Sequence, residues 1–299
     1  MKVTYDRYPE LPRFIKTFVE YTATSLATRS FILFGDIVLD DFSKRYSTID
    51  IVVILERSLW EKDFDELDNI IKKLESMNKD FAKILEVVFV PIEMLENPRI
   101  SHQDFEGMIV RNLQQELISK YPLSMKDDFL IMNKGEVLYG EDLRKNFPIP
   151  PLECFWHQFL TEIPKLEEIT KLYPFQYSSS PNYDLATNWI LTLPGILYSI
   201  QKNDIIGKMK GAYWFSNEYF GKLGDFVVEV ASCRQRNISL SSVMGVVENS
   251  RDLLLFTLEK AFSVKGVSIS KLTELFKADS GYANYSRVFM ELRNIIENL

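Results

Sequence analysis

The 299-residue chain is 46% hydrophobic and 26% charged, which is the composition of a soluble globular protein. Its net charge of −7 argues against a broad nucleic-acid-binding surface, and no apolar run approaches the roughly 18 residues of a membrane span. Cys154 and Cys233 form neither a zinc-site spacing nor a disulfide framework, and the N-terminus lacks the apolar core of a signal peptide. We therefore expect a cytoplasmic protein with no nucleic-acid partner and no membrane partner.

Hydrophobic periodicity predicts both helices and strands in the first half of the chain. The expected elements are, in order, a helix over residues 9–29, strands over 31–34 and 49–55, a helix over 60–77, a strand over 84–91, a helix over 101–121, and short extended segments over 128–132 and 135–140. The succession strand, strand, helix, strand predicts a small mixed α/β sheet.

Three prolines, Pro148, Pro150 and Pro151, end this pattern, and we place a domain boundary there. Beyond them the periodicity is helical. The expected helices cover residues 152–172, 183–201, 208–220, 224–236, 240–262, 268–276 and 281–298. The sequence therefore predicts an α+β protein, with a mixed-sheet domain over residues 1–150 followed by an all-helical domain over residues 151–299.

Two acidic residues lie inside predicted apolar strands. Asp50 is at the head of the second strand, after a polar loop with three Asp, two Ser, a Lys and an Arg. An isolated charge in such a position needs a partner because its desolvation is costly. A metal cation and a hydrogen-bonded structural role both meet that need. Glu86 lies in the third strand, where it is either an edge-strand acid facing water or a functional carboxylate.

The first two strands and their loop resemble the nucleotidyltransferase superfamily of the DNA polymerase beta type. There the first strand ends in Gly-Ser, and the second opens with Ser-Asp-Ile-Asp, whose two Asp residues hold divalent metal. This chain has the frame, with Gly35 after the first strand and the sequence YSTID at residues 46–50. It departs at two positions, since Asp36 replaces the Ser and Thr48 replaces the first Asp. The resemblance implies a nucleotide site with a degenerate motif.

Two further segments narrow the resemblance to aminoglycoside 3''- and 9-adenylyltransferases. The sequence around Glu86 is similar to the segment whose Glu serves as general base in those enzymes. The run 189–198, followed by Lys208, is similar to their helical domain, although Gly195 stands where the family has Arg. The resemblance covers residues 28–220 and implies that packing positions match while several ligand-facing positions differ.

The resemblance also implies roles for individual residues. Asp50 and Glu86 would be the catalytic and metal-binding residues, with Glu86 taking the proton of an attacking hydroxyl. The implied nucleotide-binding residues are Gly35, Asp36, Ser47, Thr48 and Lys208. The implied cofactor is Mg²⁺, with ATP as substrate and a small polar molecule, such as an aminosugar, as partner. Thr48 is a poor Mg²⁺ ligand and Asp36 would repel phosphate, so the two changes do not compensate each other.

Two main functions remain open at this stage. The first is a metal-dependent adenylyltransferase with impaired activity, which the retained Asp50 and Glu86 favour. The second is a catalytically inactive protein of the same fold that binds a nucleotide, a small molecule or a protein partner. Asp36, Thr48 and Gly195 favour this second function. A third alternative is an interaction protein without any nucleotide site.

Overall fold

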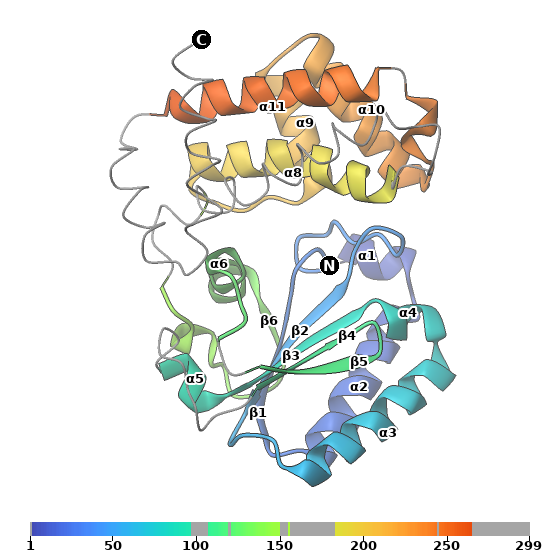
Figure 1. Ribbon diagram of the computed structural model, residues 1–299, viewed down its shortest axis with the longest axis vertical. Helices are drawn as coiled ribbons and strands as arrows, with labels where there is room; N and C mark the ends of the chain where they lie inside the picture. Colours follow the sequence, from blue (N-terminus) through green and yellow to red (C-terminus); the bar gives the residue numbers. More distant parts are fainter. Residues whose placement is uncertain are drawn as a thin grey trace. The chain divides into compact units, whose positions relative to one another are not determined.

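The computed structural model describes residues 2–96, 107–118, 121–149, 155, 183–243 and 245–264. The chain divides into two compact units, Met1–Pro150 and Pro151–Leu299 (Figure 1). The first unit contains a mixed sheet with helices and the second is helical where it is described, so the predicted α+β class is confirmed. No helix in the described ranges combines the length and apolar character needed to cross a bilayer.

The sheet of the first unit has six strands in the order β5-β4-β3-β2-β1-β6. Their bounds are β1 (Thr28–Phe34), β2 (Ile49–Leu55), β3 (Leu85–Pro91), β4 (Gly107–Arg111), β5 (Gln114–Ile118) and β6 (Glu136–Gly140). The β2–β3 pair is parallel and the other pairs are antiparallel. The β3 strand is interior, so the interpretation of Glu86 as an edge-strand acid is wrong.

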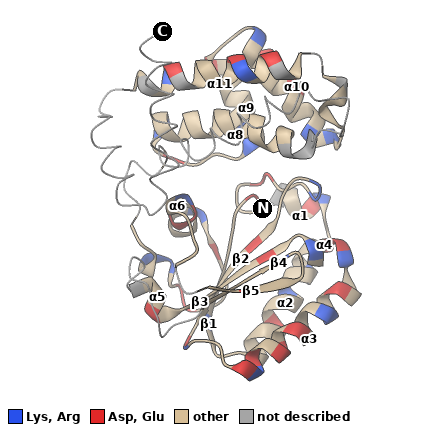
Figure 2. Ribbon diagram, viewed as in Figure 1, with Lys and Arg blue, Asp and Glu red and all other residues tan. Residues whose placement is uncertain are grey.

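Two amphipathic helices, α2 (Leu11–Ser25) and α3 (Glu61–Met77), cover one face of the sheet. Their buried side chains join alternate residues of the strands, such as Phe31 and Ile51, in one hydrophobic core. Because strand side chains alternate between faces, only every second strand residue can enter this core. Most of the charged residues of α3 are exposed on its outer side (Figure 2), whereas Asp63 in its first turn is buried.

The opposite face of the sheet receives the remaining strand residues, including Ile32 and Asp50. Helix α6 (Met125–Lys134) packs against β1. At its end, a Cβ on Gly135 would lie 2.9 Å from Cγ2 of Ile32, so the chain passes close to this face. The shorter elements of the unit are α1 (Lys2–Arg7), α4 (Lys79–Lys83), α5 (Ile92–Glu96) and η1 (Arg144–Asn146).

The helix predicted over residues 101–121 is wrong, because residues 107–118 form the β4–β5 hairpin. Asn112 and Leu113 both have positive φ, at 51° and 63°, as in the two-residue turns that match the twist of antiparallel strands. Met108 and Val110 are buried whereas Ile109 is only partly buried, which is the alternation of a strand. In so short an apolar run the sequence pattern fits both a helix and a strand, and pairing with β3 selects the strand.

The extended segment predicted over residues 128–132 is also wrong, because it belongs to α6. A capping box begins that helix: the Ser124 hydroxyl accepts a hydrogen bond from the Asp127 backbone N–H, and the Asp127 carboxylate accepts one from the Ser124 backbone N–H. This reciprocal pairing satisfies two backbone donors that a helix start would leave unsatisfied. The predicted strand over 135–140 is present as β6.

The described part of the second unit consists of packed helices. These are α8 (Tyr183–Lys202), α9 (Lys208–Glu218), α10 (Lys222–Arg236), η3 (Leu240–Ser242) and α11 (Val246–Phe262). They share one hydrophobic core, and α8 continues through Pro194. The helix predicted over 240–262 divides near Gly245, whose φ of +63° is left-handed. The helices predicted over 152–172, 268–276 and 281–298 lie outside the described residues, apart from Phe155.

Two glycines give opposite predictions for the same substitution. Gly140 ends β6 with φ +80°, and an added Cβ would lie 1.9 Å from the Arg29 carbonyl oxygen, so Gly140→Ala should destabilise the first unit by about 2–4 kcal/mol. Gly195 lies inside α8, and the nearest atom to its added Cβ among the described residues outside that helix is the Ile206 carbonyl oxygen, at 3.9 Å. Gly195→Ala should therefore stabilise the second unit by about 0.5–1 kcal/mol.

Hydrogen exchange followed separately in each unit measures both effects. Each variant is the control for the other, because each should leave the exchange of the other unit unchanged. A neutral Gly140→Ala would show that the β6 end is not held in this conformation.

Candidate functional site

Two carboxylates lie side by side at one end of the sheet. In the parallel β2–β3 ladder, Asp50 is directly opposite Glu86. Residues that are opposite each other on neighbouring strands share a face, so both side chains lie on the face that also receives Ile32. On the other side of Asp50, the antiparallel partner in β1 is Phe34, the last residue of that strand. The end of β1 therefore lies beside the start of β2, whose other neighbour is the start of β3.

Gly35 lies against the Asp50 carboxylate. A Cβ on Gly35 would be 1.9 Å from Oδ2 of Asp50, and the φ of Gly35 is +74°. Both the left-handed backbone and the close approach require glycine. This contact gives a physical reason for glycine at the position where the sequence resembles the Gly-Ser of nucleotidyltransferases.

The two positions that depart from that motif each have a hydrogen bond with a neighbour. The Thr48 hydroxyl donates to Oδ1 of Asp50 at 2.6 Å. The Ser47 hydroxyl donates to Oδ2 of Asp36 at 2.6 Å and accepts from the Ser43 backbone N–H at 3.1 Å. The segment before β2 is therefore tied to the residue that follows Gly35, and position 48 offers Asp50 a hydroxyl donor instead of another carboxylate.

The surroundings of Asp50 favour its protonated form. Burial, followed by the negative charges of Asp36, Glu86 and Asp127, raises the pKa of Asp50 to about 7, against the opposing effect of the Thr48 hydrogen bond. Asp127 is in the first turn of α6, on the same side of the sheet as Asp50. Like charges and desolvation both disfavour an additional carboxylate charge, so Asp50 titrates near neutral pH.

Glu86 has an arginine partner. The Nε of Arg111, the last residue of β4, is 2.9 Å from Oε1 of Glu86. The Glu86 side chain is 27% exposed and that of Arg111 is 58% exposed, so the pair is accessible from solvent. Any ligand of Glu86 must therefore share that carboxylate with the guanidinium or displace it.

Lys208, the remaining predicted site residue, begins α9 in the second unit. Asp50 and Glu86 belong to the first unit. Nearby in sequence, Gly195 and Gly211 mark a close crossing of α8 and α9, since a Cβ on Gly211 would lie 3.4 Å from the Cα of Gly195.

Sequence analysis missed two residues of this site, Arg111 and Asp127. Arg111 lies in the segment 101–121 that was wrongly predicted as a helix, and Asp127 lies in α6, whose residues 128–132 were wrongly predicted as extended. A hairpin centred on Asn112 would have placed Arg111 at a strand end, and the Ser-x-x-Asp sequence from Ser124 to Asp127 signals a helix start. Neither signal states which strand the new element pairs with, so neither alone predicts proximity to Asp50.

The donor set around Asp50 fits one divalent cation better than two. Across the described ranges, no three His, Cys, Asp or Glu side chains converge so as to hold a metal ion. Mg²⁺ is often bound through one or two carboxylates, with substrate phosphates and water completing its octahedron. Asp50 and Glu86 can supply that pair of carboxylates. A second cation would need a further carboxylate at the position of Thr48.

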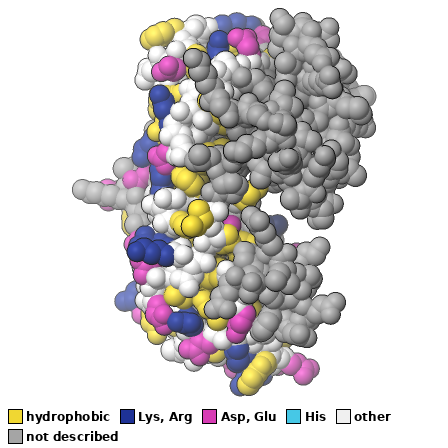
Figure 3. Space-filling view, turned by 90° about the vertical axis from the view of Figure 1, so that its left-hand side faces the viewer, with side chains coloured by type: hydrophobic (Ala, Val, Ile, Leu, Met, Phe, Trp, Pro, Cys, Tyr) yellow, Lys and Arg dark blue, Asp and Glu magenta, His cyan; other side chains and the backbone are white. Residues whose placement is uncertain are grey.

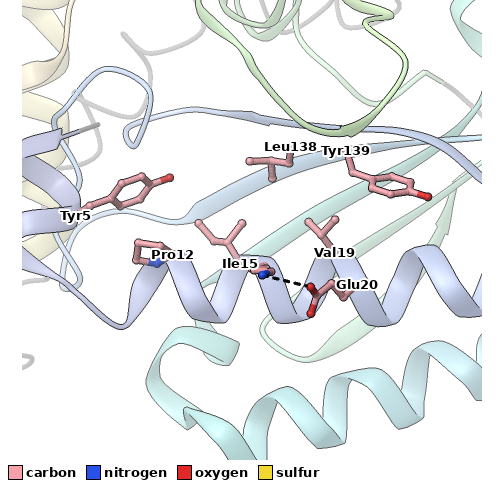
Figure 4. A pocket seen from close by; sticks show the side chains of 8 residues that line it. Tyr5, Pro12, Ile15, Val19, Glu20, Leu138 and Tyr139 are labelled. Carbon is pink, nitrogen blue, oxygen red and sulfur yellow. Dashed lines mark ion pairs between the residues drawn. The ribbon is translucent and has the colours of Figure 1, made fainter.

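A separate pocket of about 290 Å³ lies on the other face of the sheet (Figure 4). Ile15 and Val19 of α2 line it together with Leu138 and Tyr139 of β6 and Tyr5 of α1. Ile15 and Val19 belong to the core that contains the alternate strand residues, which point away from the face of Asp50. The pocket is therefore separate from the carboxylates. Its lining is mainly apolar, and the Lys16 ammonium at its edge is paired with Glu20 at 3.6 Å (Figure 4).

The remaining surface charges are mixed. On the face shown in Figure 3, Lys and Arg side chains lie among Asp and Glu side chains over the described residues. Exposed pairs such as Lys44–Asp80, at 2.6 Å, and Arg29–Glu141, at 2.7 Å, neutralise charge locally. Such pairs contribute little to stability. The environment of Asp50 differs from these exposed pairs, because this carboxylate is partly buried and the negative charges of several other carboxylates raise its pKa.

The raised pKa of Asp50 predicts a pH-dependent stability. The folded pKa of about 7 lies above the ordinary value, so the folded state binds more protons between about pH 4 and pH 7 and loses stability as the pH rises through that range. Asp50→Asn removes this loss while its amide oxygen can still accept from Thr48. We expect the variant to be about 1–2 kcal/mol more stable than wild type at about pH 8, with the difference shrinking toward about pH 4.

Urea unfolding at several pH values measures this difference. Asp65→Asn is the matched control, since Asp65 is an exposed acid of α3 outside the carboxylate cluster. A constant difference between Asp50→Asn and wild type at all pH values would contradict the assignment.

The fold is shared with a solved enzyme. The structure is similar to the crystal structure of spectinomycin adenyltransferase AAD(9) from Enterococcus faecialis with ATP and spectinomycin, with a TM-score of 0.54 and 15% sequence identity over 87% of this chain and 99% of that chain. No protein-family model matches the sequence, and no curated protein sequence matches it. At 15% identity the likeness establishes the fold alone, which is nucleotidyltransferase-like.

Proposed function

We propose that this chain is an impaired adenylyltransferase that binds ATP beside Gly35 and Asp50 and transfers AMP slowly to a hydroxyl of a small polar acceptor. The observation that carries the proposal is the in-register placement of Asp50 and Glu86 on adjacent parallel strands, with Gly35 against Asp50. The solved neighbour contains ATP and spectinomycin, which supports a nucleotide and an aminosugar-like acceptor as ligands.

In the proposed reaction, Glu86 accepts the proton of the acceptor hydroxyl while the hydroxyl oxygen bonds to the α-phosphorus of ATP. The bond from that phosphorus to the bridging oxygen breaks, and pyrophosphate leaves. Asp50 and Glu86 would hold a Mg²⁺ ion, which when bound supplies positive charge to the phosphates. Asp50 must lose its proton to act as a ligand, so cation binding should strengthen as the pH rises through about 7.

The neighbours of the two carboxylates explain why transfer should be slow. Thr48 offers a hydroxyl in place of a carboxylate, and that hydroxyl already donates to Asp50. Asp36 places a negative charge where phosphate would approach. Phosphoryl transfer depends almost wholly on positioning and electrostatics, so these changes should reduce the rate more than they affect the fold.

The nucleotide and acceptor contacts beyond the sheet belong to the same proposal. Gly35, Ser47 and Thr48 would border the phosphates, and Lys208 of the helical unit would add a point charge. We assign acceptor binding to the second unit, residues 151–299. Among the described residues outside α8, the Ile206 carbonyl oxygen at 3.9 Å is the one atom within 4 Å of a Cβ added at Gly195, and glycine offers a ligand no side chain there. An acceptor that depends on an arginine at this position should therefore bind poorly.

The second candidate is a catalytically inactive protein that retains ligand binding. The pairing of Glu86 with Arg111 at 2.9 Å favours it, because the proposed general base already has a cationic partner. The two candidates differ in turnover but not in nucleotide binding, so one pair of measurements separates them.

Thermal unfolding with saturating Mg·ATP tests binding, and pyrophosphate release with a panel of aminosugar acceptors tests transfer. We expect a clear upward shift of Tm, because a ligand that binds only the folded state stabilises it. We also expect slow pyrophosphate release that Asp50→Asn and Glu86→Gln abolish without unfolding the protein. Absence of any Tm shift would contradict the proposal, and rapid turnover would contradict impairment. Binding without turnover would select the inactive alternative.

Restoring the motif should strengthen nucleotide binding. The double variant Asp36→Ser/Thr48→Asp adds a carboxylate for the cation and removes a charge that opposes phosphate, so we expect Mg·ATP affinity to rise by about tenfold. Calorimetry in Mg²⁺ measures it, with the two single variants showing which change acts. Because the new carboxylate at position 48 would add a like charge beside Asp50, the variant should be less stable than wild type without metal. Equal affinities would place both positions outside the nucleotide site.

A further inference from the structure

Three neighbouring strands place charged residues in one row across the sheet. Asp50 of β2 is opposite Glu86 of β3 in the parallel ladder. In the antiparallel β3–β4 ladder, Val87 is opposite Val110, so the next residues outward are Glu86 and Arg111. The row therefore runs from Asp50 through Glu86 to Arg111, with all three side chains on one face.

The last member of the row is a cation beside several anions. Asp36, Glu86 and Asp127 each act on Asp50 as a negative charge. The guanidinium of Arg111 meets this group through its Nε, 2.9 Å from Oε1 of Glu86. It thus supplies at Glu86 the kind of neutralisation that a divalent cation would supply.

The geometry suggests how the arginine and a metal ion would interact. A guanidinium on one carboxylate oxygen lowers the negative potential that attracts a cation, and it occupies part of the coordination shell. Because the Arg111 side chain is 58% exposed and ends its strand, the guanidinium can leave Glu86 without disturbing the core.

We propose that Arg111 is a built-in cation that occupies Glu86 in the free protein and competes with a divalent metal ion for that carboxylate. The inference rests on the proposed function, since it concerns the same pair of carboxylates. It adds a regulating residue to that site: metal binds fully at Asp50 and Glu86 only when the guanidinium has moved away.

The test is Mn²⁺ binding measured by calorimetry at about pH 8 without nucleotide, since metal affinity depends on pH and all variants are compared at one value. Arg111→Gln should bind Mn²⁺ about tenfold more tightly than wild type, because Glu86 becomes available. The double variant Glu86→Gln/Arg111→Gln should lose that gain. Arg29→Gln is the matched control, because Arg29 pairs with Glu141 from the opposite end of β1. Arg111→Met provides a second uncharged variant, and circular dichroism verifies that each variant is folded.

The outcomes separate this inference from the proposed function. A gain in Arg111→Gln that disappears in the double variant supports competition at Glu86. Equal affinities in wild type and Arg111→Gln, or no measurable Mn²⁺ binding in any variant, would overturn it. A gain that persists in the double variant, or that also occurs in Arg29→Gln, would reflect net charge alone and would overturn it as well. Mg·ATP binding by wild type is measured independently, so the proposed function can stand when this inference fails, and the reverse.

Discussion

The contact between Gly35 and the Asp50 carboxylate is the constraint on which the rest of the site depends. It requires a left-handed glycine at the end of β1, and it fixes where the following loop begins. The parallel register of β2 and β3 then places Glu86 opposite Asp50. Because a one-residue slip would move a strand's side chains to the other face, the apolar core on the α2 side also holds the two acids together.

Holding the Asp50 carboxylate in this position has an energetic cost. Three other carboxylates act on Asp50, and together with burial they raise its pKa to about 7. A fold that needed only stability would place an apolar or amide side chain there. Strongly perturbed groups beside a specific set of charges are typical of functional sites, although structural networks also produce them. This cost supports the proposal that Asp50 takes part in a ligand site.

The sequence predicted the part of the fold whose pattern is strongest. The apolar runs of β1, β2 and β3 and the amphipathic α3 were found within a few residues of their observed bounds. The predictions for the segments that form the β4–β5 hairpin and α6 were wrong, because short segments with mixed hydrophobic patterns take their structure from strand pairing and helix capping. The omission of Arg111 and Asp127 follows directly from those two errors. Glu86 could be identified as unusual from the sequence, but its arginine partner depends on which strand pairs with β3.

The residues around the three acids of the site each supply a donor or a positive charge to one of them. Thr48 gives Asp50 a hydroxyl donor, Ser47 gives Asp36 one, and Arg111 gives Glu86 a cation. An aspartate at position 48 would instead place two carboxylates two residues apart at the start of β2, an arrangement that needs a metal ion to offset their repulsion. In this chain Asp50, Asp36 and Glu86 each have a hydrogen-bond or ion-pair partner within the protein. Under the proposed function, a cation at Asp50 and Glu86 would therefore compete with the hydroxyl and guanidinium partners of these carboxylates.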